Sequence, residues 1–475
     1  MHPLPEILQE IRKCSKKLQT YFEDIHAENE RLRVENAQLH ARINSNSTNS
    51  DAPPSSNPFK KPESLRVKTG KKPGAQAGHK GSTLKTDKNP DKVVRHKVCS
   101  CSHCGRDISE HKAYKHKKHQ VIDVKVTRVV TEHQTEVKCC PYCGKQTFAT
   151  FPYGAGHYVQ YGPCYSAMMV CFNQGNHIPY DRLSKISKDI FGIAISCGTL
   201  VNIVKRCAGS LKGSMEYIKD QLKRSAVLHV DETGIRVNGK NHWLHNASNN
   251  KYTYVKTHLK RGSIATDDIG ILASFKGVAV HDFWKSYYNY TDCSHAICNA
   301  HILRELNGII ENSKQLWALR MKALLIEINK QANACLRYLP TSKAKKYEAR
   351  YGKILVMADK ENPIKKDIMQ KRHIRGRIPR SKARNLIDRM KLYKNDILRF
   401  MYDPNIPFDN NQAERDIRMS KLQQKISGCF RSSDGNEAFG KIRSYISTAS
   451  KHEISMFESI YRAISGNPLF AGDTS

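Results

Sequence analysis

The sequence predicts a multidomain α+β protein with an N-terminal coiled coil, a small zinc-binding domain, a helical helix-turn-helix-like region and an α/β domain that carries a helical insertion. Three observations predict this class. The chain has 475 residues, more than one typical domain of about 100–200 residues. Its apolar residues recur with a helical period in some segments and alternate in others. Two Cys-x-x-Cys-Gly pairs precede the alternating segments.

The composition is strongly basic. Lys and Arg total 79 against 44 Asp and Glu, a formal net charge of +35. This excess predicts a polyanionic partner, most simply double-stranded DNA, and a solubilising surface charge is the alternative. No apolar run reaches the roughly 18 residues that a membrane-spanning helix needs, so a span of this kind is excluded. The N-terminus lacks the pattern of a secretory signal. We therefore expect a cytoplasmic protein whose 15 cysteines serve as metal ligands or buried thiols, since thiols stay reduced there.

Residues 1–45 are predicted to form a coiled-coil helix. Between residues 7 and 43, Leu or Ile recurs every seven residues, which is the coiled-coil signature; the positions are Ile11, Leu18, Ile25, Leu32 and Leu39. Asn29 and Asn36 fall on the other core position, where Asn favours a parallel, in-register dimer. We expect a homodimer or higher oligomer through this helix. A helix that packs on its own domain is the alternative.

Residues 46–95 are predicted to be a basic linker or arm. Asn, Ser and Pro dominate its first part, and no apolar period is present. Between residues 60 and 118 there are 17 Lys and Arg against 5 Asp and Glu. Four side chains in a glycine-rich motif are candidates for DNA phosphate contacts: Lys71, Lys72, His79 and Lys80. A disordered basic linker is the alternative. The two interpretations agree if the arm is disordered when free and becomes ordered on binding.

The two Cys-x-x-Cys-Gly pairs indicate a zinc-binding domain at residues 96–150. Each glycine permits a tight turn that lets two thiolates face one ion, and two such pairs make a closed, structural zinc site. The expected ligands are Cys101, Cys104, Cys140 and Cys143, with Cys99, His103 and Cys139 as spare candidates. Alternation from about Gln120 to Val137 predicts a strand pair between the two Cys pairs. Unrelated buried or exposed thiols are the alternative.

Residues 151–222 are predicted to be helical. Gly192 marks a turn between two helices, and Ser196 is a candidate N-cap of the second helix. Leu200, Ile203 and Val204 form its buried stripe. The pattern matches a helix-turn-helix whose second helix, about residues 196–207, enters a major groove. An ordinary helical hairpin is the alternative.

Alternating patterns recur in the segment at residues 223–310. Residues 226–258 predict a three-stranded antiparallel meander, whose first apolar run ends in Asp231. Thr233 shares the face of Asp231, whereas Glu232 points the other way. A carboxylate at this place is poorly explained by packing.

Two further acids complete a candidate metal site. Residues 277–282 repeat the pattern of an apolar strand followed by an acid, Asp282. Glu414 lies on a helix that Asp409 or Asn410 is expected to cap, and Lys421 shares its face. Two Asp and one Glu can hold two divalent cations about 3.5–4 Å apart. Oxygen ligands suit Mg²⁺ or Mn²⁺, which predicts phosphoryl transfer with Lys421 steadying a phosphate. Solvated turn residues are the alternative.

Residues 311–400 are predicted to be a basic helical insertion in this catalytic fold. From Lys365 to Arg399 there are 13 Lys and Arg against 3 Asp and Glu. Four arginines are candidates for DNA backbone contacts: Arg372, Arg375, Arg377 and Arg380. A solvated basic helix face is the alternative. The second part of the core follows at 401–452, and a C-terminal tail at 453–475.

The order of these motifs resembles the transposases of the insertion sequence 66 family. The resemblance covers nearly the whole chain and includes the two Cys pairs and five short motifs: KPGAQAGHKG (72–81), PYDRL (179–183), DET (231–233), AHILRE (300–305) and DNNQAER (409–415). It implies a DDE transposase with a ribonuclease-H-like catalytic domain whose acids are Asp231, Asp282 and Glu414. Lys421 matches the spacing of a Glu-x6-Lys motif. The second acid is followed by Phe-Trp-Lys-Ser-Tyr, where the family usually has Gly-Tyr-x-x-Tyr.

The resemblance also implies a reaction and its partners. Metal-dependent cleavage at transposon ends would free a 3′-hydroxyl that then attacks target DNA. Terminal inverted repeats and target DNA are the expected substrates, accessory proteins of the same element are candidate partners, and the bacterial nucleoid is the expected location. Two other classes stay open: a DNA-binding regulator with an inactive core, and a structure-specific nuclease with the same fold.

Overall fold

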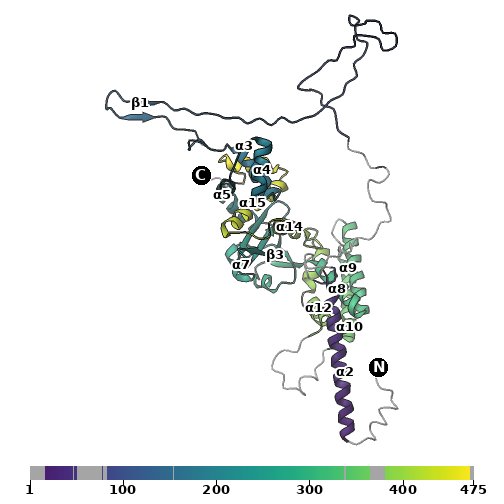
Figure 1. The fold of residues 1–475 in the computed structure, drawn as a ribbon. Coiled ribbons are helices and arrows are strands. Elements are labelled where there is room, and N and C mark those ends of the chain that lie inside the picture. Colours follow the sequence, from purple (N-terminus) through teal and green to yellow (C-terminus); the bar gives the residue numbers. More distant parts are fainter. Residues whose placement is uncertain are drawn as a thin grey trace.

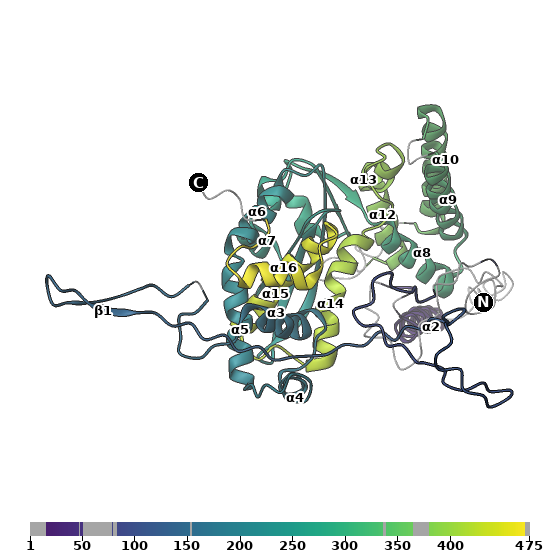
Figure 2. The same ribbon diagram turned by 90° about the horizontal axis from the view of Figure 1, so that it is seen from above.

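The computed structural model describes residues 16–46, 48–50, 78, 83–152, 154–335, 339–363 and 380–470. These residues form a mixed α+β protein, with one five-stranded sheet surrounded by helices (Figures 1 and 2). A long helix and a long extended segment project from this body (Figure 1). No helix in these ranges is long and apolar enough to cross a membrane.

The projecting helix is α2 (Lys16–Ile43), which confirms the predicted helix over its described part; Ile11 lies outside it. The four remaining Leu and Ile positions of the heptad pattern are 40–47% exposed. At the end of α2 the chain meets α8 (Asn299–Ser313), where the Asn49 amide donates to the Glu311 carboxylate at 2.6 Å. The apolar stripe of α2 is therefore partly exposed along its described length.

The extended segment spans residues 83–152. Its only strands among the described residues are β1 (Val137–Cys139) and β2 (Gln146–Phe148), which pair antiparallel around the second Cys pair. The strand pair predicted between the two Cys pairs is wrong, because residues 120–136 contain no strand. Their alternating apolar side chains face solvent, with Val121 93% exposed. Alternation marks a strand only where a neighbouring strand and a core face are present.

The helical region that follows packs against the sheet. Its elements are α3 (Pro163–Val170), the π-helical turn η2 (Cys171–Gly175), α4 (Tyr180–Phe191), α5 (Cys197–Ser210) and α6 (Lys212–Lys223). The predicted turn and cap are confirmed: Gly192 ends α4 with a φ of 64°, and the Ser196 hydroxyl accepts the Thr199 N–H at 3.1 Å. The predicted stripe of α5 is buried in the core.

The sheet contains the predicted meander and two further strands. The strands are β3 (Val227–Val237), β4 (Lys240–Ser248), β5 (Thr253–His258), β6 (Val278–His281) and β7 (Ser294–Ile297). Asn238 and Gly239 join β3 to β4 with φ values of 47° and 72°, the sign that a type I′ hairpin turn requires. The strand order is β5-β4-β3-β6-β7, and β6 and β7 run parallel to β3. Strand β3 therefore lies at the centre.

Further helices lie in the connections between strands and at the C-terminal end of the described chain. The connections after β5 and β6 contain α7 (Ser263–Ile269) and the short 3₁₀ helices η3 (Leu272–Ser274) and η4 (Lys285–Asn289). The chain ends with α14 (Asn411–Ser427), α15 (Ser433–Lys451) and α16 (Met456–Ile464). Ile460 and Ala463 of α16 are fully buried. The segment predicted as a C-terminal tail thus includes a helix of the core.

The segment predicted as an insertion is helical where it is described. It contains α9 (Leu316–Ala334), α10 (Thr341–Glu361), α12 (Lys382–Leu392), α13 (Lys394–Leu398) and the short η5 (Arg399–Met401). These helices and α8 form their own core around Trp317 and Tyr351, which joins the sheet through Val280 and Ile297. This unit therefore rests on the β6–β7 side of the sheet.

Candidate active site

The pairing of β3 with β6 places the first two acids. Parallel pairing with β6 ends at His229 and Val280, whereas β3 continues to Val237 and keeps its pairing with β4 there. Asp231 therefore lies inside β3 and not at its end, just beyond the last β6 pair. Asp282 directly follows β6, as predicted. Both acids thus lie beyond the carboxyl ends of paired parallel strands, where α/β sheets commonly place ligands.

Asn410 positions the third acid. Its side-chain Nδ2 donates to the Val230 carbonyl at 2.9 Å, and its Oδ1 lies 2.7 Å from the His229 ring. The side chain was predicted as a candidate helix cap, but it is used to tie the start of α14 to β3. Asp409 instead accepts the Asn411 N–H at 3.2 Å. This anchoring brings Glu414, in the first turn of α14, to the side of β3 that carries Asp231.

The three acids interact electrostatically. The pKa of Asp231 is raised to about 8, mainly by burial and then by the negative charges of Glu232, Asp282 and Glu414. Burial also raises the pKa of Asp282, against a 2.9 Å hydrogen bond that its Oδ1 accepts from the Trp284 N–H. Asp231 therefore lies within the field of both other acids, although the three come from separate parts of the chain.

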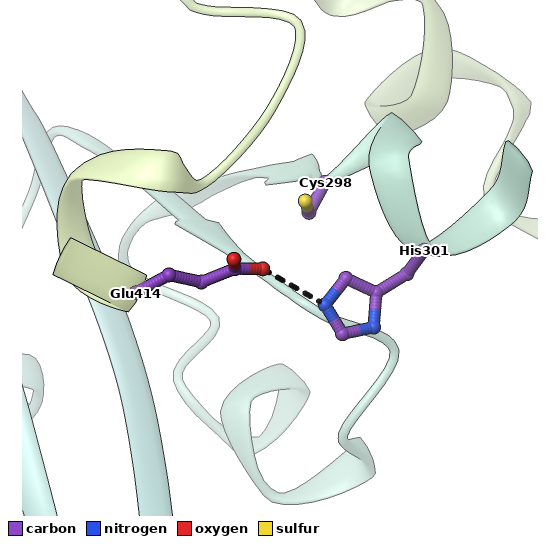
Figure 3. Close-up of side chains that lie close together, drawn as sticks. All are labelled: Cys298, His301 and Glu414. Atoms are coloured by element: carbon purple, nitrogen blue, oxygen red, sulfur yellow. Dashed lines mark ion pairs between the residues drawn. The ribbon is translucent and has the colours of Figure 1, made fainter. Parts of the chain in front are cut away.

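Two side chains of α8 lie beside the Glu414 carboxylate. His301 Nε2 and Arg304 Nη2 each lie 3.5 Å from Glu414 Oε1. The hydrogen bond from His301 and the charge of Arg304 hold the pKa of Glu414 below its usual value. Cys298, at the start of α8, is next to the same carboxylate (Figure 3). Both residues belong to the AHILRE motif (300–305), which by itself predicted no role for either side chain.

Glu232 faces the other side of β3, as predicted, and is only 3% exposed. Arg261 donates to its carboxylate from Nε at 3.0 Å and Nη2 at 2.8 Å, and the Tyr287 hydroxyl donates to it as well. The guanidinium stacks 3.4 Å from the ring centre of Trp284. These contacts tie β3 to the segment after Asp282. Sequence reasoning missed them, and the aromatic run after that acid was their only signal.

Lys421 does not join the acids in this structure. Its Nζ donates to the Gly234 carbonyl, and burial lowers the pKa of its amine. Gly234 follows Asp231 by three residues, about 10 Å along a strand. Lys421 thus binds the part of β3 that leaves the acid cluster.

The two Cys pairs adopt the same turn. The Gly105 N–H donates to the Cys101 carbonyl at 2.8 Å, and Gly144 donates to Cys140 at 2.9 Å. Backbone N–H groups, first those of His103 and Tyr142, lower the pKa of the Cys101 and Cys140 thiols. The structure does not bring the four predicted zinc ligands together. Among the described residues, Cys298, His301 and Glu414 are the only group of three or more metal-ligating side chains in mutual reach.

The predicted DNA contacts fall mostly outside the described part. Seven of the eight predicted contact residues lie outside the described residues: Lys71, Lys72, His79, Lys80, Arg372, Arg375 and Arg377. The eighth, Arg380, donates to Asp388 at 2.6 Å in an exposed ion pair. Its contact with DNA remains a prediction.

Comparisons with known families agree with the predicted one. A family described as "Transposase IS66 family" matches residues 159–438, which is more than half of the chain and includes β3 to β7, the helical insertion and α14. A family of unknown function (DUF6444) matches residues 3–85. A search of curated proteins found no match. The match over the sheet and all three acids shows that the chain belongs to the IS66 family of transposases.

Proposed function

We propose that this transposase cleaves and joins DNA with the carboxylates of Asp231, Asp282 and Glu414, which would hold two divalent cations. The observation that carries this proposal is the pKa of Asp231, raised to about 8 by burial and three neighbouring carboxylates. Buried like charges destabilise one another, and cations relieve that repulsion. A cluster of this kind has a clear use in binding metal ions and little use in packing.

The donor atoms fit magnesium or manganese. All three side chains offer carboxylate oxygens, the hard ligands that these ions prefer. When bound, such ions would activate the attacking oxygen and stabilise the leaving oxygen of a phosphodiester. The acids come from β3, from the residue after β6 and from α14, so the site depends on the fold of the whole sheet.

Other side chains would orient the acids and the DNA. Asn410 holds α14 against β3 through the Val230 carbonyl. Arg304 and His301 lie beside Glu414 and would donate hydrogen bonds to a phosphate oxygen. Water would be the nucleophile in cleavage and the freed 3′-hydroxyl in strand transfer. Lys421 would have to release the Gly234 carbonyl before it steadied a phosphate.

The proposal extends to the other parts of the chain. The mixed sheet with Asp231 on its central strand supports a ribonuclease-H-like core. The matching turns of the two Cys pairs support a structural zinc site, and the exposed stripe of α2 supports self-association. The α4–α5 pair, the basic arm and the insertion would contact terminal inverted repeats and target DNA. The strong positive charge of the chain favours such contacts.

An in vitro strand-transfer assay tests the chemistry. Purified protein is incubated with Mg²⁺ or Mn²⁺ and labelled DNA that carries the element's own ends. We expect a joined product with the wild type and none with Glu414→Gln. Glu437→Gln is the matched control, because Glu437 is exposed on α15 and pairs only with Lys441 among the ion pairs of the described residues. Joining by the Glu414 variant, or DNA binding without cleavage by the wild type, would contradict the proposal.

A further inference from the structure

Cys298 forms a group with His301 and Glu414, and its thiol has no part in the phosphoryl transfer proposed above. The thiol sulfur, one imidazole nitrogen and one carboxylate oxygen all lie within 4.8 Å of one another. Figure 3 shows the three side chains converging from two elements, with Glu414 reaching from α14 toward His301 on α8. Cys298 is the residue that precedes α8, and His301 lies three residues further on. Residues with this spacing share one face of a helix.

The donor set differs from that of a magnesium site. A thiolate is a soft ligand and imidazole suits Zn²⁺, whereas Mg²⁺ takes oxygen ligands. A tetrahedral zinc site that retains one open position commonly has three protein ligands. Cys298 is only 1% exposed, so its presence beside the acids is not that of a surface thiol. Cys298, His301 and Glu414 therefore favour a different ion from the one favoured by the carboxylates of Asp231, Asp282 and Glu414.

Local contacts position the Cys298 sulfur and leave room for adjustment. The Asn410 backbone N–H donates to the Cys298 sulfur at 3.1 Å. Burial raises the pKa of this thiol, so an ion that binds there displaces a proton. Arg304 also contacts the Glu414 carboxylate, so its side chain must move before a cation can bind there. Its side chain is 25% exposed, which gives it a path to solvent. Movement of the Arg304 side chain toward solvent would therefore open the site to a cation.

We propose that Cys298, His301 and Glu414 bind a zinc ion, and that this ion inhibits DNA cleavage by withdrawing Glu414 from the catalytic cations. The binding step stands on the three side chains alone. The inhibition step rests on the proposed function, because it requires Glu414 to be one of the catalytic acids. The site would make the transposase sensitive to the level of free zinc.

A cobalt titration of the full-length protein tests the binding step. Co²⁺ replaces Zn²⁺ in sulfur-containing sites and gives an absorption band from thiolate-to-metal charge transfer. We expect the wild type to bind one more equivalent of Co²⁺ than Cys298→Ser, on top of any bound by the two Cys pairs. Cys293→Ser is the matched control, since Cys293 is also buried and lies just before β7. It should titrate like the wild type.

Equal cobalt stoichiometry in the wild type and the Cys298 variant overturns the site. If Cys298→Ser does not fold, as judged by circular dichroism, His301→Asn provides the same comparison, with the same expected loss of one equivalent. A loss of signal in the Cys293 variant as well would also count against the proposal. None of these readouts requires an active transposase.

Zinc inhibition of strand transfer tests the second step. With Mg²⁺ present, added Zn²⁺ should abolish the joined product of the wild type, and Cys298→Ser should need at least about tenfold more zinc. If cobalt binds but both proteins need the same zinc concentration, the inhibition step is wrong and the binding site still stands. A wild type that never forms product in Mg²⁺ contradicts the proposed function, while the cobalt titration still decides the site.

Discussion

Replacing Asp231 with Asn tests the electrostatics of the acid cluster, because it removes a charge and keeps the shape. Burial and neighbouring carboxylates raise the pKa of Asp231 from 3.8 to about 8. Its Oδ1 accepts the Glu232 N–H at 2.9 Å, and an Asn side chain can accept the same bond. We expect Asp231→Asn to lose strand transfer and, without divalent ions, to be more stable than the wild type.

The size of this effect follows from the pKa. A carboxyl whose pKa is raised by folding takes up a proton on folding between pH 3.8 and about 8, so the wild type loses stability as pH rises through this window. The amide of the Asp231→Asn variant cannot ionise, so the variant does not lose stability in this way. About three pH units separate pH 7 from the unfolded pKa, and at about 1.4 kcal/mol per unit the gain is at most about 4 kcal/mol. With about 2–4 °C per kcal/mol, a gain of about 4 kcal/mol raises the Tm by roughly 8–16 °C.

Thermal unfolding followed by circular dichroism measures this gain in the full-length protein. With EDTA, the difference in Tm between the variant and the wild type should be near zero at about pH 4 and should grow toward pH 8. Mg²⁺ should then raise the Tm of the wild type only. Asp220→Asn, which removes an exposed ion pair with Arg224, is the control and should change little. A variant that melts below the wild type at pH 7, or a difference that does not grow with pH, would refute the reasoning.

Three further substitutions test other parts of the structure. Asn410→Ala leaves the buried Val230 carbonyl without its side-chain donor, so we expect a loss of about 1–3 kcal/mol in urea unfolding and a weaker strand-transfer product. Lys421→Met removes a bond to the carbonyl of Gly234, away from the acids, so strand transfer should fall less than in Glu414→Gln; an equal loss would mean that the lysine reaches the phosphate. Leu32→Glu places a charge on the exposed stripe of α2 and should convert an oligomer to monomer in light scattering, and an unchanged mass would contradict the coiled coil.

The antiparallel meander and the strand before Asp282 followed from the sequence, because their signals are local. Apolar alternation located β3, β4 and β5, and an apolar run followed by an acid located β6. The extent of β3 did not follow. The apolar run stops at Val230, but β3 continues because its pairing with β4 extends to Val237. Strand ends are decided by the partner strand, which a single sequence does not display.

The contacts around the acids could not be predicted from the sequence either, because they join segments that are distant in the chain. Asn410 and Val230 are 180 residues apart, and Arg261 reaches Glu232 from a different loop. A helix-cap pattern explains an Asn before a helix equally well, so only the fold separates the two roles. The valines of residues 120–136 show the opposite case, in which a strand pattern is present and no pairing accompanies it.

The structure suggests why a transposase of this kind needs so many contacts around three acids. The cluster is unfavourable for folding without cations, since Asp231 is protonated at neutral pH when its pKa is about 8. The bonds of Asn410 to β3, and of Arg261 and Tyr287 to Glu232, act on the same strand from opposite faces. Each fixes β3 to a segment that carries or directly follows another acid. None of these bonds uses the carboxylate of Asp231 or Asp282, so β3 is held in place by neighbouring residues and not by ion pairs of these two acids.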